Sequence, residues 1–318
     1  MGILSETMNE TTAATQEQPL DLRRHAHPGE TLIQGFLFFC AVVSILTTIG
    51  IVFVLFEEAA RFFNSPEVEF LAFLTGTVWQ PKLGAFGIWP LLVATLMTTA
   101  VAMLIALPLG LAVAIYLSEY ASPRARSLIK PTLEILAGIP TVVYGYFALT
   151  LMTPLLRSIF GADTVDIYNT ASAGLVMGIL LLPLIATISE DAMHAVPRSL
   201  REAAYGLGAT RLETAVQVVA PAATSGIAAA VILAVSRAIG ETMIVAVAAG
   251  AGPNLTLNPF KGAETITGHI VRISGGDLSW ESVDYNSLFA LALVLFVLTL
   301  ILNIISQKVV RKFREEYE

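Results

Sequence analysis

An arginine and a glutamate, Arg237 and Glu241, stand four residues apart beside a long apolar stretch of the chain. On a helix, residues spaced by four share one face, so the two side chains are predicted to lie together. Ionisable groups inside a membrane span are costly and commonly mark a ligand pathway. The guanidinium fork of Arg237 suits the oxygens of an oxyanion, and Ser236 and Thr242 add hydroxyl groups nearby. A buried ion pair that only holds the helices together is the alternative.

A further ionisable residue, Glu134, precedes Gly138, Ile139 and Pro140 at the start of another apolar stretch. Glycine and proline interrupt the helical ladder and can open backbone groups to a cavity. We therefore place Glu134 among the predicted substrate-pathway residues. The alternative is a glutamate near a helix N-terminus that is stabilised by the helix dipole. The four histidines have no ligand spacing and are assigned to loops or the N-terminal tail, so neither a metal site nor a catalytic residue is predicted.

The elements that position these residues are predicted to be membrane helices. Of 318 residues, 55% are hydrophobic and only 14% are charged, whereas a soluble domain carries about a quarter charged residues. Six intervals of 22 to 36 residues contain no charge, and roughly 20 apolar residues cross a bilayer as a helix. Backbone groups must be paired in lipid, so the chain is predicted to be an all-α bundle. The six spans are predicted at 32–56, 89–117, 131–154, 171–189, 224–249 and 285–306.

The distribution of basic residues predicts the orientation of these spans. The two tails and the connections 118–130 and 190–223 together hold 12 lysines and arginines, whereas the opposite connections hold five. Because basic residues concentrate on the cytoplasmic side, both termini are predicted to be cytoplasmic. We expect a disordered tail over 1–30, a transmembrane domain over 31–308 and a second tail over 309–318. The tryptophans at predicted outer boundaries are expected to anchor the chain at the membrane interface: Trp79, Trp89 and Trp280.

The connection between the fourth and fifth predicted spans is unusually long and amphipathic. Its central part contains Glu202, Ala203 and Ala204, followed by Gly208 and, further on, Pro221. The pattern predicts short helices, with Gly208 at a position of positive φ that reverses the chain. Pro221 is suited to the first turn of the next helix.

This connection resembles the cytoplasmic coupling motif of bacterial ABC importer permeases. The residues that match it are Glu202, Ala203, Ala204, Gly208, Val218 and Pro221, with Ala220 where leucine is commoner. The resemblance implies that the loop 190–221 inserts into a separate cytoplasmic ATPase. The chain has no glycine-rich phosphate loop of its own, so it is expected to bind no cofactor, with ATP and magnesium held by that partner.

A second resemblance covers nearly the whole chain from about residue 30, to PstC-type permeases of bacterial phosphate importers. It implies a type I (MetI-like) ABC importer permease in a bacterial inner membrane, which is not an enzyme and binds no nucleic acid. It also implies a second homologous permease, two ATPase subunits and an external phosphate-binding protein as partners. The stretches that carry the resemblance are Trp79–Pro81, Phe86–Leu91, Leu107–Gly110, Tyr116–Tyr120, Leu136–Gly145 and Ser236–Thr242.

The carboxylate of Glu241 is expected to contribute to selectivity between oxyanions. Phosphate retains protons at neutral pH and can donate a hydrogen bond to Glu241, whereas sulfate cannot. Glu241 is therefore expected to favour phosphate over sulfate, while Arg237 supplies attraction. Two alternatives remain: an importer of another oxyanion such as sulfate or molybdate, and an integral membrane enzyme that acts on phosphorylated lipids.

Overall fold

The computed structural model describes residues 28–276 and 282–312. Contacts divide the chain into two units, Met1–Val52 and Phe53–Glu318. The described part of the first unit belongs to a single helix, α1 (Pro28–Phe63), which from Leu32 onward is mostly apolar, with a mean hydropathy of 2.7. A helix that is apolar all round requires an apolar solvent or a fully buried position, and α1 is long enough to span a bilayer. The predicted tail up to residue 27 lies outside the described residues.

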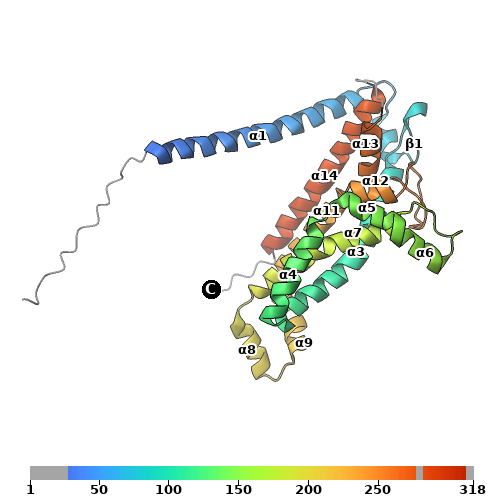
Figure 1. Ribbon diagram of the computed structural model, residues 1–318. Helices are drawn as coiled ribbons and strands as arrows, with labels where there is room; N and C mark the ends of the chain where they lie inside the picture. The colour runs from blue at the N-terminus through green and yellow to red at the C-terminus, as the bar shows by residue number, and fades with distance from the viewer. Residues whose placement is uncertain (1–27, 277–281, 313–318) are drawn as a thin grey trace, which may run out of the picture. The chain divides into compact units, whose positions relative to one another are not determined.

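The second unit consists almost entirely of helices (Figure 1). Its long helices are α3 (Trp89–Ile115), α7 (Thr170–His194) and α14 (Val283–Lys312). The segment Thr141–Phe160 is continuous and contains α5 (Thr141–Phe147), the π turn η3 (Ala148–Met152) and α6 (Thr153–Phe160). The remaining helices are α2 (Phe70–Thr75), η2 (Tyr116–Tyr120, a π turn), α4 (Pro123–Gly138), α8 (Arg198–Gly206), α9 (Arg211–Thr214), η4 (Ala215–Val219, a π turn), α10 (Ala220–Ala222), α11 (Thr224–Ile239), α12 (Met243–Ala248) and α13 (Ile266–Ser274).

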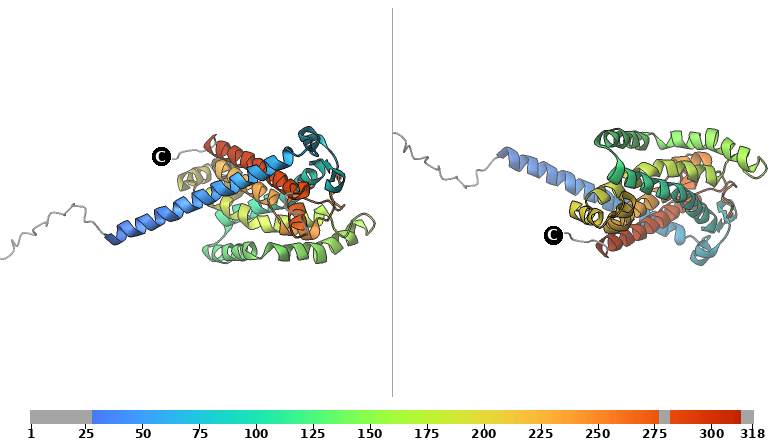
Figure 2. Two further views of the ribbon diagram at one scale, coloured as in Figure 1. Left: turned by 90° about the horizontal axis from the view of Figure 1, so that it is seen from above. Right: turned by 90° about the horizontal axis from the view of Figure 1, so that it is seen from below.

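Helix α7 is the central element of this unit. It packs against α3, α4, α5, α11 and α12, and most of its side chains are buried. In Figure 2, α4 to α6 lie along one edge of the unit and α14 along the other. Small residues let α3 and α7 approach closely, because a Cβ on Gly174 would lie 2.7 Å from the Cβ of Val101. Close backbone approach through small residues is a common way for membrane helices to associate.

The two ends of the second unit differ in structure. At one end, a short hairpin of β1 (Trp79–Gln80) and β2 (Ala85–Phe86), connected by the 3₁₀ turn η1 (Pro81–Leu83), packs near α13 (Figure 1). An apolar cluster rich in aromatic rings fills this end, with Phe62, Phe73 and Trp79 all fully buried. At the other end, α8 and α9 project beyond the long helices (Figure 1).

Two predicted spans are wrong in their bounds. The third, 131–154, is divided at Ile139 and Pro140, because the residue before a proline avoids the helical region; the span is Thr141–Phe160, and α4 is separate. The fifth, 224–249, is broken after Ile239. Helix α11 has 16 residues, which rise about 24 Å, short of the roughly 30 Å of hydrocarbon.

Within the described residues, five helices are long and apolar enough to span a membrane, and a sixth span results if the helices over Arg211–Ala222 and Thr224–Ile239, bent by 75°, are counted together. The all-α, polytopic fold class is therefore confirmed. Helix α14 continues to Lys312, beyond the predicted end of the domain at 308. Its last turns carry Lys308 and Arg311, which are favourable at a helix C-terminus.

Candidate substrate passage and coupling surface

The break between α11 and α12 is organised by Glu241. Its Oε1 accepts hydrogen bonds from the backbone N–H groups of Met243 at 3.1 Å and Ile244 at 3.4 Å. The carboxylate, one residue before the N-cap Thr242, therefore pairs two backbone N–H groups of the first turn of α12. The hydroxyl of Thr267 on α13 donates to the Glu241 carbonyl at 2.6 Å, which holds the broken segment against α13. Glu241 is buried, with 9% of its surface exposed.

The predicted sharing of one helix face by Arg237 and Glu241 is wrong. The spacing of four has that meaning only on a continuous helix, and α11 ends at Ile239. Among the described residues, no ion pair between the two is present. The predicted ion-pair alternative for this site is therefore not what the structure contains.

The structure instead brings Arg237 together with Glu134. Both line a cavity of about 210 Å³ between α4, α7 and α11. Its remaining walls are mainly apolar, from Leu133 and Ala137 on α4 and from Leu180, Pro183, Leu184, Thr187 and Ile188 on α7. The side chains of Arg237 and Glu134 are exposed in the isolated chain. An arginine fork at the edge of an apolar cavity is suited to the oxygens of a small anion.

The two predicted hydroxyl residues differ in their surroundings. The Oγ of Ser236 is buried and has no hydrogen-bond partner among the described residues. A buried hydroxyl without a partner is costly, so Ser236 can gain a bond when a ligand or a neighbouring group approaches. Thr242 donates to the Gly240 carbonyl at 3.1 Å, and its hydroxyl is thus used within the break itself.

The predicted short helices of the loop 190–221 are confirmed as α8, α9, η4 and α10. Gly208 has φ 88°, so its predicted chain-reversing conformation is confirmed. Thr210 and Glu213 form a capping box that starts α9, and Pro221 lies in the first turn of α10. Glu202 and Ala203 are exposed on α8, whereas Ala204 is buried against the rest of the unit. Helix α8 thus has one exposed side and one buried side.

Ion pairs connect the helices at this end of the unit. Local sequence patterns did not predict them. Glu190 on α7 has a fully buried side chain and pairs with Arg126 and Lys130 of α4. Glu119, at the end of η2, pairs with Arg201 of α8 at 3.0 Å. The only sequence signal was that each glutamate ends a charge-free interval, so each lies where a span meets the membrane boundary.

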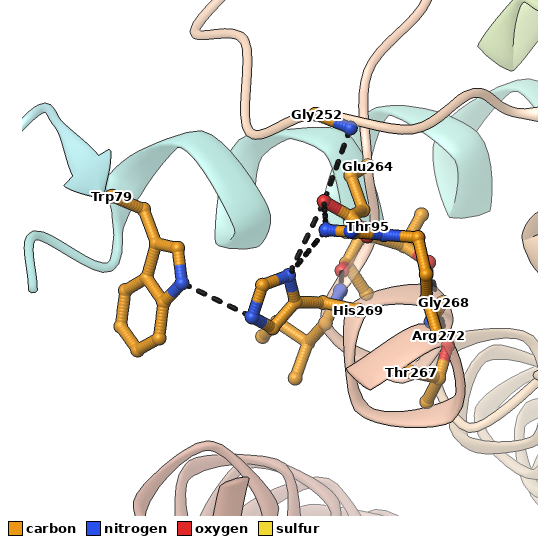
Figure 3. Close-up of polar contacts among 10 residues, drawn as sticks. Trp79, Thr95, Gly252, Glu264, Thr267, Gly268, His269 and Arg272 are labelled. Carbon is orange, nitrogen blue, oxygen red and sulfur yellow. Dashed lines mark hydrogen bonds and ion pairs between the residues drawn. The ribbon is translucent and has the colours of Figure 1, made fainter. Parts of the chain in front are cut away.

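A buried polar cluster at the opposite end was also missed (Figure 3). Trp79 Nε1–H donates to His269 Nε2 at 3.1 Å, and His269 Nδ1 lies 3.2 Å from Glu264 Oε2. Arg272 Nε donates to Glu264 Oε1 at 2.5 Å. His269 is thus buried in α13, not in a loop as predicted, and Trp79 is buried, not an interfacial anchor. Trp280, predicted as another anchor, lies outside the described residues.

His269 and Arg272 stabilise the ionised form of Glu264. Burial by itself raises the pKa of this carboxyl, but the hydrogen bonds and charges of His269 and Arg272 outweigh burial and leave the pKa below its ordinary value of 4.5. The hydrogen bond to Glu264 raises the pKa of Arg272, against the effect of burial. The cluster thereby fixes the hairpin, α13 and the preceding loop to one another.

Long apolar helices, one of them broken beside a cavity that Arg237 lines, and a projecting segment of short helices define an integral membrane protein. The chain belongs to the family of binding-protein-dependent transport system inner membrane components, whose model matches residues 106–315. It is therefore the permease component of a binding-protein-dependent ABC importer, a transport subunit and not an enzyme.

Individual relatives agree with this assignment. A probable ABC transporter permease protein, YqgH of Bacillus subtilis, is 32% identical over 92% of this chain and 94% of its own length. The phosphate transport system permease protein PstC of Mesorhizobium japonicum is 33% identical over 74% of this chain and 77% of its own. A crystal structure of a bacterial alginate ABC transporter, in complex with a periplasmic protein that binds an alginate pentasaccharide, shares the fold at a TM-score of 0.62 and 14% identity, over 89% of this chain and 96% of that one. The predicted resemblance to PstC-type permeases is confirmed.

Proposed function

We propose that this chain is one of two permease subunits of an ATP-driven importer of inorganic phosphate. The observation that carries the proposal is the cavity between α4, α7 and α11, which Arg237 and Glu134 both line beside a broken membrane helix. Broken helices at mid-membrane sites are typical of transporters, because their ends offer backbone groups and dipoles to the ligand. The phosphate permeases among the relatives support phosphate as the substrate.

The remaining parts of the machine follow from the same proposal. A second homologous permease completes the passage, and an external binding protein delivers phosphate to it. Two ATPase subunits bind ATP and magnesium and dock on α8 and α9, where Glu202 and Ala203 are exposed and Gly208 turns the chain. The distribution of basic residues supports a bacterial plasma membrane protein with both termini in the cytoplasm.

Uptake of radiolabelled phosphate by the assembled importer in proteoliposomes tests the substrate. Arg237→Gln removes the charge-assisted hydrogen bonds and is expected to lower uptake roughly tenfold or more. Arg124→Gln, on the exposed surface of α4, is the control and is expected to transport normally. Normal uptake by Arg237→Gln would remove this residue from the passage. Uptake of sulfate or molybdate in place of phosphate by the wild type would establish a different oxyanion.

The proposed selectivity of Glu241 can be tested separately from its structural role. In Glu241→Gln the side-chain oxygen still accepts the two N–H bonds that cap α12, so the break is expected to persist. What is lost is the negative charge and the second carboxylate oxygen, which would accept the hydrogen bond from phosphate and becomes an amide donor. We expect sulfate to compete better in this variant; unchanged discrimination with retained phosphate uptake would show that Glu241 only caps the helix.

A further inference from the structure

The side chain of Arg201, in the segment 190–221, contacts three other parts of the chain: η2, α7 and the link that follows α7. It belongs to α8, and its guanidinium contacts Glu119 at the end of η2. The same group donates to the last turn of α7, from Nη2 to Met193 O at 2.8 Å, and to the link that follows α7, from Nη1 to Val196 O at 2.6 Å. The fork is therefore fully used by partners on α3–η2, on α7 and on the link that follows α7.

The contact with Glu119 has the geometry of a strong pair. Arg201 Nε lies 3.2 Å and 3.3 Å from the two carboxylate oxygens, and Nη2 lies 3.0 Å from Oε1. Ser118 donates to the same carboxylate at 2.8 Å. The side chain of Glu119 is 4% exposed and that of Arg201 is 14% exposed. Charge-assisted, bidentate bonds shielded from water are both stronger and more directional than exposed pairs.

The links on either side of α8 are otherwise short and non-helical. Ala195 to Pro197 connect it to α7, and the turn at Leu207 to Thr210, with the positive φ of Gly208, connects it to α9. Between these links, Leu200 and Ala204 of α8 pack against the unit. Arg201 points from α8 into the unit, whereas Glu202 and Ala203 remain exposed on the same helix. The arginine thus adds polar contacts with η2 and with α7 to this apolar packing of α8.

We propose that Arg201 and Glu119 form a positioning pair that transmits movement of α8 to α3 and α7 together. The proposal rests on the proposed function, in which an ATPase moves the short helices. A displacement applied to the exposed side of α8 passes through the guanidinium to the ends of two membrane helices that are themselves closely packed. Lysine retains the charge but has no planar fork, so it cannot hold Glu119 and the two carbonyls at once.

The assembled importer in proteoliposomes tests the pair through two readouts, phosphate taken up per ATP hydrolysed and the stimulation of ATP hydrolysis by loaded binding protein. Arg201→Lys and Glu119→Gln are each expected to lower both readouts roughly fivefold or more, the lower range of coupling effects between sites. The amount of ATPase that copurifies is expected to be unchanged. Arg198→Lys, an exposed arginine on the same helix, is the matched control.

The double variant shows whether the two residues act as a unit. If they do, Arg201→Lys with Glu119→Gln loses no more coupling than the more severe single variant. Losses that multiply, or normal coupling in Arg201→Lys, would overturn the proposal. Should these variants fail to assemble, Glu119→Asp keeps the charge but shortens its reach, and unimpaired coupling in that variant would equally overturn it.

The same experiment separates this inference from the proposed function. A wild-type importer that hydrolyses ATP but takes up no phosphate contradicts the proposed substrate. The pair is then judged by the stimulation of ATP hydrolysis alone, which does not require phosphate to cross the membrane.

Discussion

The close contact of α3 and α7 gives a sharp prediction for Gly174→Ala. The added Cβ would lie 2.7 Å and 2.8 Å from the Cβ and Cγ1 of Val101 and 2.9 Å from the carbonyl oxygen of Thr98. Side-chain atoms can shift, but the carbonyl belongs to the backbone of α3, so the two helices must move apart. Overpacking of this kind costs about 1–3 kcal/mol.

The thermal unfolding midpoint of the purified importer in detergent provides the measurement. A loss of that size lowers the midpoint by roughly 2–12 °C, if each kcal/mol corresponds to about 2–4 °C. Gly35→Ala is the matched control, because it also places a methyl group on a helical glycine but meets nothing within 4 Å. We expect its midpoint to be unchanged or slightly higher. Equal midpoints for the two variants would refute the close packing of α3 on α7.

Three further predictions concern the two ends of the second unit. Because the folded-state pKa of Glu264 is lowered, the stability that this carboxylate contributes is complete above pH 4.5 and is lost as the pH falls through the folded pKa. The thermal midpoint of the wild type should therefore fall on acidification towards that of Glu264→Gln. A difference between the two midpoints that stays constant with pH would contradict the lowered pKa. Trp79→Phe removes the donor to His269 and should cost about 1–3 kcal/mol, measured as a lower midpoint; an unchanged midpoint would contradict a stabilising role of this bond. Gly208→Ala places a side chain at φ 88°, which costs about 1–2 kcal/mol; we expect less ATPase to copurify with this variant than with Gly206→Ala, whose added methyl group meets nothing within 4 Å.

The membrane helices were predictable because the signal is local. An interval without charge reports directly on the solvent that a segment requires, so α1, α3, α7 and α14 follow from the positions of their bounding charges. The same rule contains no information on where an apolar segment bends. It therefore joined α4 to the following span across Pro140, and it carried the fifth span through Gly240.

The candidate site was predictable in residue type but not in arrangement. Arg237 stood out because an arginine beside an apolar stretch is costly, yet its neighbour across the cavity is Glu134, which lies about a hundred positions away in sequence. Glu119 and Arg201 are 82 residues apart, so no spacing rule connects them. Such pairs are determined by how helices pack, and local patterns do not specify helix packing.

Glu119 lies in a π turn, Tyr116–Tyr120, so its orientation depends on the number of residues in the helix that precedes it. A regular helix advances about 100° per residue, and a π turn accommodates one residue more than an α turn. Removing the extra residue of the π turn would restore a regular turn with little rotation, whereas removing a single residue from the regular helix before it, α3, would rotate Glu119 about 100° around the helix axis, away from Arg201. A relative that is one residue shorter within α3 would carry the same acid on the wrong side of the helix. The contact between Glu119 and Arg201 therefore depends on the number of residues in this helix as well as on their types.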